Sequence, residues 1–187
     1  SHDWSVTSRG FSGLPTAGGL LSNKLLAMID GRSIYTPLFG GVYWDVENLM
    51  LQDVDRIEVV SGPGGTLWGA NAVNGVINIR TKSSKETQGL FISQTLGGSD
   101  LIFQDHSEMR YGGQIDTNIY FRIYGQHFEM NRRGAGDTAN KYVMKRGGFR
   151  TDYLQSKDNT FTLQGDFYTG DENNRSRRAL VTGQNVL

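Results

Sequence analysis

Hydrophobic and polar residues alternate along several segments in the second half of the chain. Residues 117–130, TNIYFRIYGQHFEM, place Phe121 and Ile123 on one face of an extended strand and Arg122 and Tyr124 on the other. A period of two residues, with one apolar and one polar face, is typical of antiparallel sheets exposed on one side. Similar alternation occurs at 106–113, 147–155 and 160–168. We therefore predict an antiparallel meander whose polar face carries Arg122, Arg150, Gln164 and Asp166.

The connections between these segments favour a membrane barrel without deciding for it. LGGSD, QID and SKDN are short, whereas residues 130–145 and 169–184 are long, which places both long loops at one end of the sheet. Outer-membrane barrels have short periplasmic turns and long outer loops. A soluble β-sandwich shows the same alternation, but its apolar residues face a second sheet instead of lipid. The residues that distinguish the two are Ile119, Phe121, Phe149, Phe161, Leu163 and Phe167.

The first half of the chain has a different pattern, with short strands that are apolar on both faces. KLLAMIDG, VDRIEVVSG and VINIRTK are rich in branched residues and read as three strands of one sheet covered on two sides, with SVTSRG as a further candidate. Between them, Val46, Leu49 and Met50 follow the i, i+3, i+4 spacing of one or two helical turns. The predicted fold is a compact α+β unit.

A glycine-rich stretch, RIEVVSGPGGTLWGANAVNGVINI at 56–79, joins the last two of these strands. It lacks the Gly-Lys-Ser/Thr ending of a phosphate-binding loop, and Leu67 occupies the third glycine position of a dinucleotide fingerprint. We therefore interpret it as a tight crossing between strands. In that crossing Gly62, Gly64 and Gly65 supply positive φ, Pro63 stiffens the turn, and Gly69 and Gly75 allow close approach of backbones.

Composition argues against several classes of chemistry. Nineteen basic residues balance 19 acidic ones, so nothing indicates nucleic acid as a partner. The absence of cysteine excludes disulfides, thiolate zinc sites and cysteine nucleophiles. The histidines, at 2, 106 and 127, have no metal-ligand spacing. We expect no metal, no cofactor and no catalytic site, and hence no enzyme activity.

LLAMIDGRSIY, followed by DVDRIEVVSGPGGTLWGANAVNGVINIRTK, resembles the plug domain of TonB-dependent outer-membrane receptors, and the resemblance extends over about residues 4–82. Members of that family carry a strand ending in Asp-Gly, then R-I-E-V-x-R-G-P, an aromatic-Gly pair and G-V-I-N-I-x-T-K. The resemblance implies a plug domain at 1–85 that lacks its N-terminal part. It also implies that 86–187 form about five first strands of a truncated barrel, since plugged transporters have 22. The fold class is then an α+β plug with a mixed sheet, followed by antiparallel barrel strands.

The resemblance also assigns structural roles within the plug. The matching motif residues are Arg9, Asp30, Gly31, Arg56, Glu58, Gly62, Pro63, Gly69, Gly75 and Asn78. One position departs from the family, because Ser61 replaces an arginine that in relatives forms ion pairs with the barrel wall. Either Arg56 or Arg9 takes over that contact, facing a carboxylate such as Glu108, or the contact is absent. Alternatively, Arg56 and Glu58 are solvated strand charges.

The loop after the Asp-Gly strand is the candidate ligand site, because in the family it lies near the substrate cavity. Its candidate contacts are Arg32, Tyr35, Phe39, Tyr43 and Trp44. Aromatic, weakly charged loops suit a bulky, partly apolar ligand. In the alternative interpretation, Tyr43 and Trp44 pack in the plug core.

The resemblance implies a receptor of the bacterial outer membrane that imports a scarce nutrient by energy-coupled rearrangement of the plug. A ferric siderophore is the first candidate ligand, followed by cobalamin and haem. The implied partners are outer-membrane lipid and the TonB energy-transducing complex, whose contact segment is expected before residue 1. The alternative function is a soluble or secreted β-rich binding module without transport.

Overall fold

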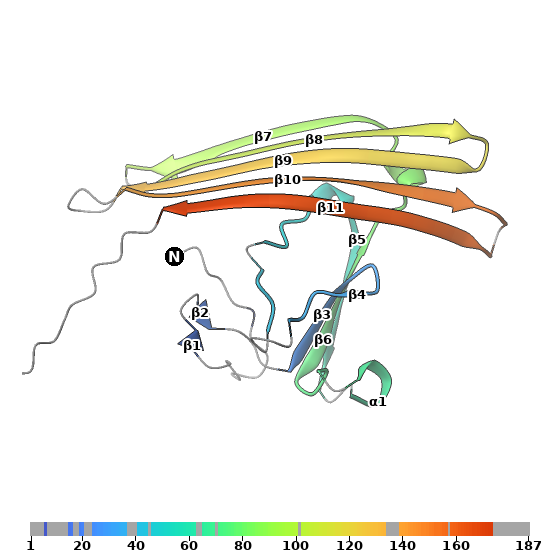
Figure 1. Ribbon diagram of the computed structural model, residues 1–187, viewed down its shortest axis with the longest axis horizontal. Helices are drawn as coiled ribbons and strands as arrows, with labels where there is room; N and C mark the ends of the chain where they lie inside the picture. The colour runs from blue at the N-terminus through green and yellow to red at the C-terminus, as the bar shows by residue number, and fades with distance from the viewer. Residues whose placement is uncertain are drawn as a thin grey trace, which may run out of the picture.

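Two main sheets form the molecule, and the larger one curves over the smaller (Figure 1). A two-stranded sheet of β1 (Pro15–Thr16) and β2 (Gly19–Leu20) accompanies them. The computed structural model describes residues 6, 15–16, 19–20, 24–36, 41–44, 46–62, 65–69, 71–100, 102–133, 139–156 and 158–173. The predicted strand at 5–10 lies almost entirely outside these residues.

The smaller sheet, which we call the plug sheet, has the strand order β4-β3-β6-β5. Its strands are β3 (Leu25–Ile29), β4 (Arg32–Ser33), β5 (Val54–Ser61) and β6 (Gly75–Thr81). Strands β3 and β6 are parallel and the other pairs are antiparallel, so the sheet is mixed. The predicted sharing of one sheet by the three apolar strands is confirmed.

The core of this unit lies on β3 and β6. All five residues of β3 are buried, and Val76, Ile77 and Ile79 of β6 pack with them. Strand β5 differs, because Ile57 and Val59 are 56% and 65% exposed. The prediction that all three strands are covered on both faces is therefore wrong for β5. It is the edge strand, and its only strand partner in the described part of the chain is β6.

Helices are few among the described residues. They are α1 (Gly65–Trp68) and the 3-10 helices η1 (Leu51–Asp53) and η2 (Ser84–Thr87). The helical turns predicted at Val46, Leu49 and Met50 are absent, because Met50 has extended backbone (φ −64°, ψ 111°) and the single turn of η1 follows it. The α+β description is thus not confirmed, and the architecture is mainly β. No helix in the described ranges has the length and apolarity needed to cross a membrane.

The glycine-rich crossing uses its glycines for two different reasons. Gly62, Gly69 and Gly75 have φ of 108°, 92° and 145°, which favours glycine. A Cβ at Gly75 would also lie 2.6 Å from the main-chain oxygen of Val60, whereas one at Gly69 would meet nothing within 4 Å. Close approach is therefore confirmed at Gly75 only. Gly65 begins α1, and residues 63 and 64 lie outside the described residues.

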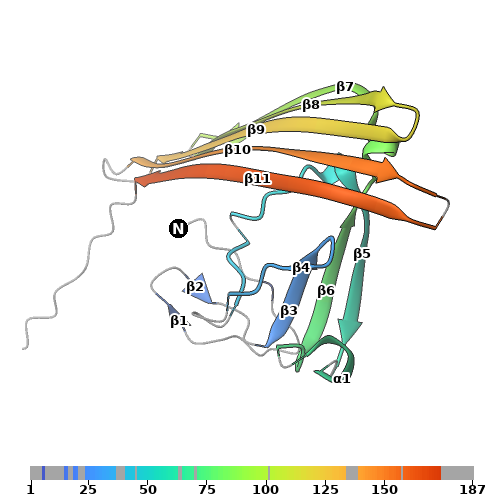
Figure 2. The same cartoon turned by 45° about the vertical axis from the view of Figure 1, so that its right-hand side comes forward.

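The larger sheet, which we call the barrel sheet, is an antiparallel meander of consecutive neighbours, as predicted. Figure 2 shows its strands running across the direction of the plug strands. The strands are β7 (Gly89–Ser99), β8 (Ile102–Asp116), β9 (Ile119–Arg133), β10 (Ala139–Leu154) and β11 (Thr160–Asn173).

These strands are longer than predicted. Strand β9 continues to Arg133 and β10 begins at Ala139, both inside the expected long loop over 130–145, and β11 continues to Asn173 into the second expected loop. The predicted QID turn lies inside β8 instead, and Thr117 and Asn118 form the turn. Backbone pairing continues where both faces are polar, with support from cross-strand contacts such as Lys141 Nζ to Glu129 Oε1 at 3.0 Å.

The two faces of the barrel sheet have the predicted composition. Arg122, Arg150 and Gln164 lie directly opposite one another on adjacent strands, and Phe121 lies opposite Thr151 on the other face. The polar face is turned toward the plug sheet, since Arg122 and Arg150 contact Thr81. The apolar face is exposed instead of packing on a second sheet, as a barrel requires and a sandwich does not. Its exposed members include Ile123, Phe149, Phe161, Leu163 and Phe167.

Candidate functional site: the interface of plug and barrel sheets

Arginines at inward positions of the barrel sheet make most of the polar contacts with the plug. They are Arg110 on β8, Arg122 on β9, and Arg146 and Arg150 on β10. Arg122 and Arg146 are each 5% exposed. Buried guanidinium groups need anionic or carbonyl partners, and the plug supplies them.

The first group of contacts, which we call the strand-end cluster, forms around Thr81 at the end of β6. The Thr81 N–H and hydroxyl donate to the two carboxylate oxygens of Asp30 at 2.8 and 2.7 Å. Arg150 Nη1 and Arg122 Nη2 donate to the Thr81 hydroxyl oxygen at 2.9 and 3.0 Å. Arg150 also pairs with Asp30 at 3.4 Å. The same contacts thus hold the ends of both β3 and β6 against the barrel sheet.

Asp53, in η1, completes the strand-end cluster. It is 5% exposed, and its carboxylate accepts a hydrogen bond from Arg110 and lies 3.7 Å from Arg122 Nε. The Asp53 main-chain oxygen accepts from the Lys82 N–H at 2.8 Å. Arg122 Nη1 donates to the Lys82 main-chain oxygen at 2.7 Å. Two guanidinium groups therefore compensate one buried carboxylate.

A second group, the loop cluster, holds the segment before η1. Arg146 Nη1 donates to the Val46 main-chain oxygen at 2.9 Å, and its Nη2 pairs with Asp166 and lies 3.8 Å from Glu47. Arg32 reaches Asp166 from the plug side at 3.8 Å. Burial raises the pKa of Glu47 above its ordinary value, and the charges of Arg146 and then Arg32 oppose this rise.

The linker between the sheets is also fastened. The Ser84 N–H donates to Asp152 Oδ2 at 2.6 Å, and the Ser84 hydroxyl donates to the Arg150 main-chain oxygen at 3.0 Å. Ser83 and Glu86 form a capping box on η2. The pKa of Glu86 is lowered, chiefly by the hydrogen bond from the Ser83 hydroxyl. The path from plug to barrel is thus rigidly held at 83–87.

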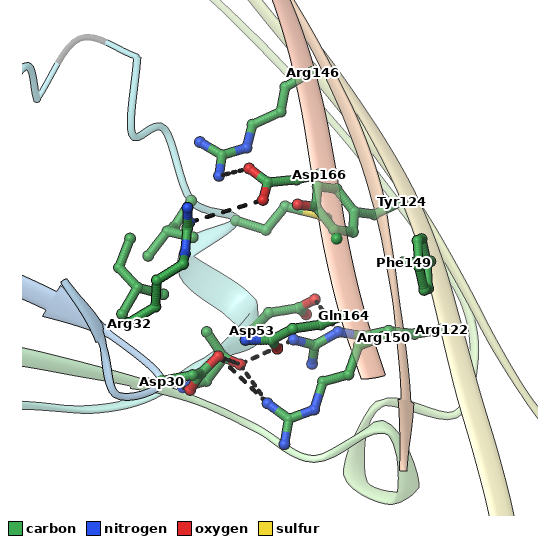
Figure 3. Close-up of a pocket in the computed structure, with 15 residues that line it drawn as sticks. Asp30, Arg32, Asp53, Arg122, Tyr124, Arg146, Phe149, Arg150, Gln164 and Asp166 are labelled. Atoms are coloured by element: carbon green, nitrogen blue, oxygen red, sulfur yellow. Dashed lines mark hydrogen bonds and ion pairs between the residues drawn. The ribbon is translucent and has the colours of Figure 1, made fainter. Parts of the chain in front are cut away.

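A cavity of about 310 Å³ lies between the two clusters (Figure 3). The Arg32, Asp166 and Arg146 contacts lie on one side of it, and Asp30 and Arg150 lie on the other. Its polar lining residues are Asp30, Arg32, Asp53, Thr81, Arg122, Tyr124, Arg146, Arg150, Gln164 and Asp166.

The candidate ligand residues are not gathered at one exposed surface. Tyr35 is 8% exposed and belongs to the plug core, and Trp44 packs against that core. Tyr43 is half-buried, Arg32 is exposed, and Phe39 lies outside the described residues. These positions leave a role in ligand binding as a prediction.

Among the motif residues, Asp30 has a larger role than the turn alone requires, because it binds both Thr81 and Arg150. Gly31 has φ of 80°, which suits the turn after β3. Asn78 donates to Glu58 at 2.8 Å, which ties β6 to β5. Arg9 and Pro63 lie outside the described residues.

Of the alternatives for Arg56, a contact with Glu108 is wrong. Arg56 lies on the exposed edge strand β5 and pairs with its own neighbours Glu58 at 2.7 Å and Asp55 at 3.0 Å. Glu108 instead accepts from Gln126 at 3.0 Å. In the described ion pairs of the strand-end cluster, the cation comes from the barrel sheet and the anion from the plug.

Sequence reasoning missed Asp53, Thr81, Arg110 and Arg146 as members of this interface. A usable signal was present, since Arg110 and Arg146 fall on the same face as Arg122 and Arg150 once the strands are in register. Nothing in the sequence marked Asp53 as their partner.

Comparisons with known proteins agree with this architecture. The family model for the TonB-dependent receptor plug domain matches residues 2–76. A vitamin B12 transporter, BtuB, from Vibrio vulnificus is 36% identical over 96 residues, covering 51% of this chain and 14% of that protein. An iron-regulated outer membrane virulence protein from Vibrio cholerae is 27% identical over 141 residues, covering 71% of this chain and 21% of that protein.

Solved structures show the same fold. The siderophore receptor PirA from Acinetobacter baumannii matches with a TM-score of 0.59 at 18% identity, covering 80% of this chain and 24% of that one. A ferric enterobactin receptor from Pseudomonas aeruginosa, in complex with enterobactin, matches with a TM-score of 0.56 at 18% identity, covering 82% and 27%.

A mixed plug sheet that lies against the polar face of an antiparallel sheet is thus an arrangement similar to the plug and barrel of the matched receptors. Residues 2–76 thus match the plug domain of TonB-dependent receptors, and one of the relatives named above is an outer membrane protein. The chain spans 14% of the length of the BtuB relative and 21% of the length of the iron-regulated relative.

Proposed function

We propose that this chain is part of a receptor that binds a scarce nutrient and imports it into the periplasm when the plug rearranges. Residues 1–85 supply the later part of the plug and 86–187 the first five strands of the barrel. The observation that carries the proposal is the polar seam, in which Asp53 and Asp30 of the plug meet Arg110, Arg122 and Arg150 of the wall.

A polar seam suits a plug that must move. Buried ion pairs add little net stability compared with well-packed apolar side chains, because desolvation offsets their attraction. When such a seam opens, water can solvate both surfaces, whereas an apolar seam would expose hydrophobic area. The plug can therefore separate from the wall without a permanent loss of fold.

Opening still requires work, because many contacts break together and the linker at Ser84 remains fastened. Nothing in the strand-end or loop cluster supplies that work. The proposed source is the TonB energy-transducing complex, acting on the plug. Outer-membrane lipid is the second proposed partner and covers the apolar face of β7–β11.

An iron–siderophore complex is the first proposed ligand, and the fold shared with siderophore receptors is compatible with it. Cobalamin is the second candidate, since the BtuB relative is 36% identical over half of this chain. Haem follows, because a heme/hemopexin utilization protein from Haemophilus influenzae is 33% identical over 78 residues. The proposed contacts are Arg32, Tyr35, Phe39, Tyr43 and Trp44.

Uptake assays test this function. The full-length receptor would be produced in a bacterial host that lacks its own siderophore and cobalamin receptors. We expect accumulation of iron-55 given as ferric enterobactin, or of cobalt-57 cyanocobalamin, only when the host has an intact TonB system. Equal accumulation with and without TonB would contradict the proposal.

A further inference from the structure

Two buried arginines beside the cavity have donor groups without partners. Arg122 Nε and Arg146 Nε are buried and make no hydrogen bond among the described residues. Their side chains are 6% and 3% exposed, and both line the cavity between the clusters. Buried guanidinium N–H groups normally have an acceptor, so each unpaired atom calls for one.

The carboxylates around the cavity are already engaged. Asp30 accepts from Thr81, Asp53 from Arg110, and Asp166 from Arg146. On the same sheet, the Gln164 side chain of β11 lies beside Arg150, lines the cavity and has no hydrogen-bond partner in the described part of the chain. The lining carboxylates are therefore not free to accept from the two Nε atoms.

The charge of the lining also favours an anionic ligand. Four arginines and three aspartates line the cavity, which gives the formal balance of one positive charge. The lining arginines are Arg32, Arg122, Arg146 and Arg150. Arginine presents a planar fork of N–H groups that matches the oxygens of carboxylate and phosphate.

We propose that this cavity binds a small oxyanion of the phosphate or carboxylate class, held by Arg122, Arg146 and Gln164. The volume of about 310 Å³ accommodates one such anion with several waters, because a water occupies roughly 30 Å³. The anion accepts from the guanidinium groups of Arg122 and Arg146 and so links the barrel arginines of both clusters. Its place is in the seam between the plug sheet and the barrel sheet.

The test uses purified full-length receptor in detergent, at constant ionic strength set with chloride. Inorganic phosphate and acetate are the two probes, and binding is measured by isothermal titration calorimetry. We expect saturable binding of at least one probe. Saturation by phosphate alone identifies a phosphate site, and saturation by both identifies a general oxyanion site.

Variants at Gln164 locate the binding. Gln164→Leu removes one donor without touching either ion cluster and should weaken binding about tenfold, as expected for a hydrogen bond to a charged group. Gln164→Glu should abolish binding at pH 7 by repulsion. Gln94→Leu is the matched control, since Gln94 is exposed on β7 and is not in the lining, and it should bind like the unchanged receptor.

If neither probe shows saturable binding, the cavity holds only water and the inference is overturned. Equal affinities in all variants would overturn it as well. The inference does not depend on transport. A receptor that imports its nutrient but binds neither probe fails this test alone, and one that binds phosphate but imports nothing fails only the proposed function.

Discussion

Arg122 of the barrel wall donates from Nη1 to the main-chain oxygen of Lys82, the residue that follows plug strand β6, over 2.7 Å. The same guanidinium donates to Thr81 at 3.0 Å and lies 3.7 Å from Asp53. One buried side chain thus joins the end of the plug sheet, η1 and the wall. The plug is held by arginines that the barrel extends inward.

Removal of this side chain should loosen the plug. In Arg122→Ala, Asp53 keeps only Arg110, and Thr81 and Lys82 each lose a donor. Breaking a buried ion-pair network costs about 3 kcal/mol. We expect a lower unfolding midpoint in denaturant and greater entry of large antibiotics into cells that carry the full-length receptor.

Arg56→Ala is the matched control, because Arg56 lies on exposed β5 and pairs only with neighbouring carboxylates. It should leave both readouts unchanged. Equal effects of the two alanine variants would show that Arg122 has no special role in holding the plug.

The glycines of the crossing should differ in their tolerance of substitution. At Gly75, alanine places Cβ 2.6 Å from the Val60 main-chain oxygen, so β5 and β6 cannot pair as they do. At Gly69, only the positive φ of 92° opposes a side chain, at a cost of about 1–3 kcal/mol. Gly75→Ala should therefore abolish assembly, measured as heat-resistant barrel migration in gels.

Gly69→Ala should assemble with reduced stability, and Gly69→Val should fare worse because valine is β-branched. If Gly75→Ala assembled as well as Gly69→Ala, the close approach of the two strands would not constrain the fold.

Glu47 should make stability depend on pH. Its folded pKa is raised above the ordinary value of 4.5, chiefly by burial. The protonated carboxyl is therefore favoured in the folded state, and its contribution is fully present below pH 4.5. It is lost as the pH rises through the raised folded pKa.

Glu47→Gln removes this titration. The melting temperature of the variant should gain on that of the unchanged receptor as the pH rises from 4.5 toward neutrality. The gain is partly offset by loss of the Arg146 contact at 3.8 Å. A difference between the two proteins that stays constant from pH 4 to 8 would refute the assignment.

Two substitutions in the ligand loop should have different effects, one on stability and the other on nutrient binding. Tyr35 is 8% exposed in the plug core, so Tyr35→Ala should cost about 3 kcal/mol of stability through the cavity it leaves. Stacking of one aromatic ring on a ligand contributes about 1 kcal/mol, so Phe39→Ala should weaken nutrient binding about fivefold. Unchanged affinity in assembled Phe39→Ala protein would remove Phe39 from the site.

The sequence was sufficient to predict both sheets, since their signals are local. Alternation along β9 and β11 reports which residues share a face, and the apolar run of β3 reports burial on both sides. Strand ends were misjudged because pairing continues into segments that are polar on both faces. The α+β expectation failed because helical spacing at 46–50 could not reveal the extended backbone of Met50.

The interface could be predicted only in part. Asp53 and Arg110 are 57 residues apart, and their contact depends on how two sheets cross, which no local pattern encodes. The family motif also pointed to a plug arginine as the cation. With Ser61 at that position and Arg56 directed to Glu58, the ion pairs of the strand-end cluster have their cations on the barrel sheet instead.

The central claim is that barrel arginines hold plug carboxylates in the closed receptor, and a double-mutant cycle on Asp53 and Arg110 tests it most directly. Asp53→Asn, Arg110→Gln and the double variant would be unfolded in denaturant as full-length receptor. We predict that the losses of unfolding free energy in the two single variants sum to more than the loss in the double variant, by more than about 1 kcal/mol, as expected for a contacting pair. Losses that add to within about 0.5 kcal/mol would show that the pair does not hold the plug to the wall.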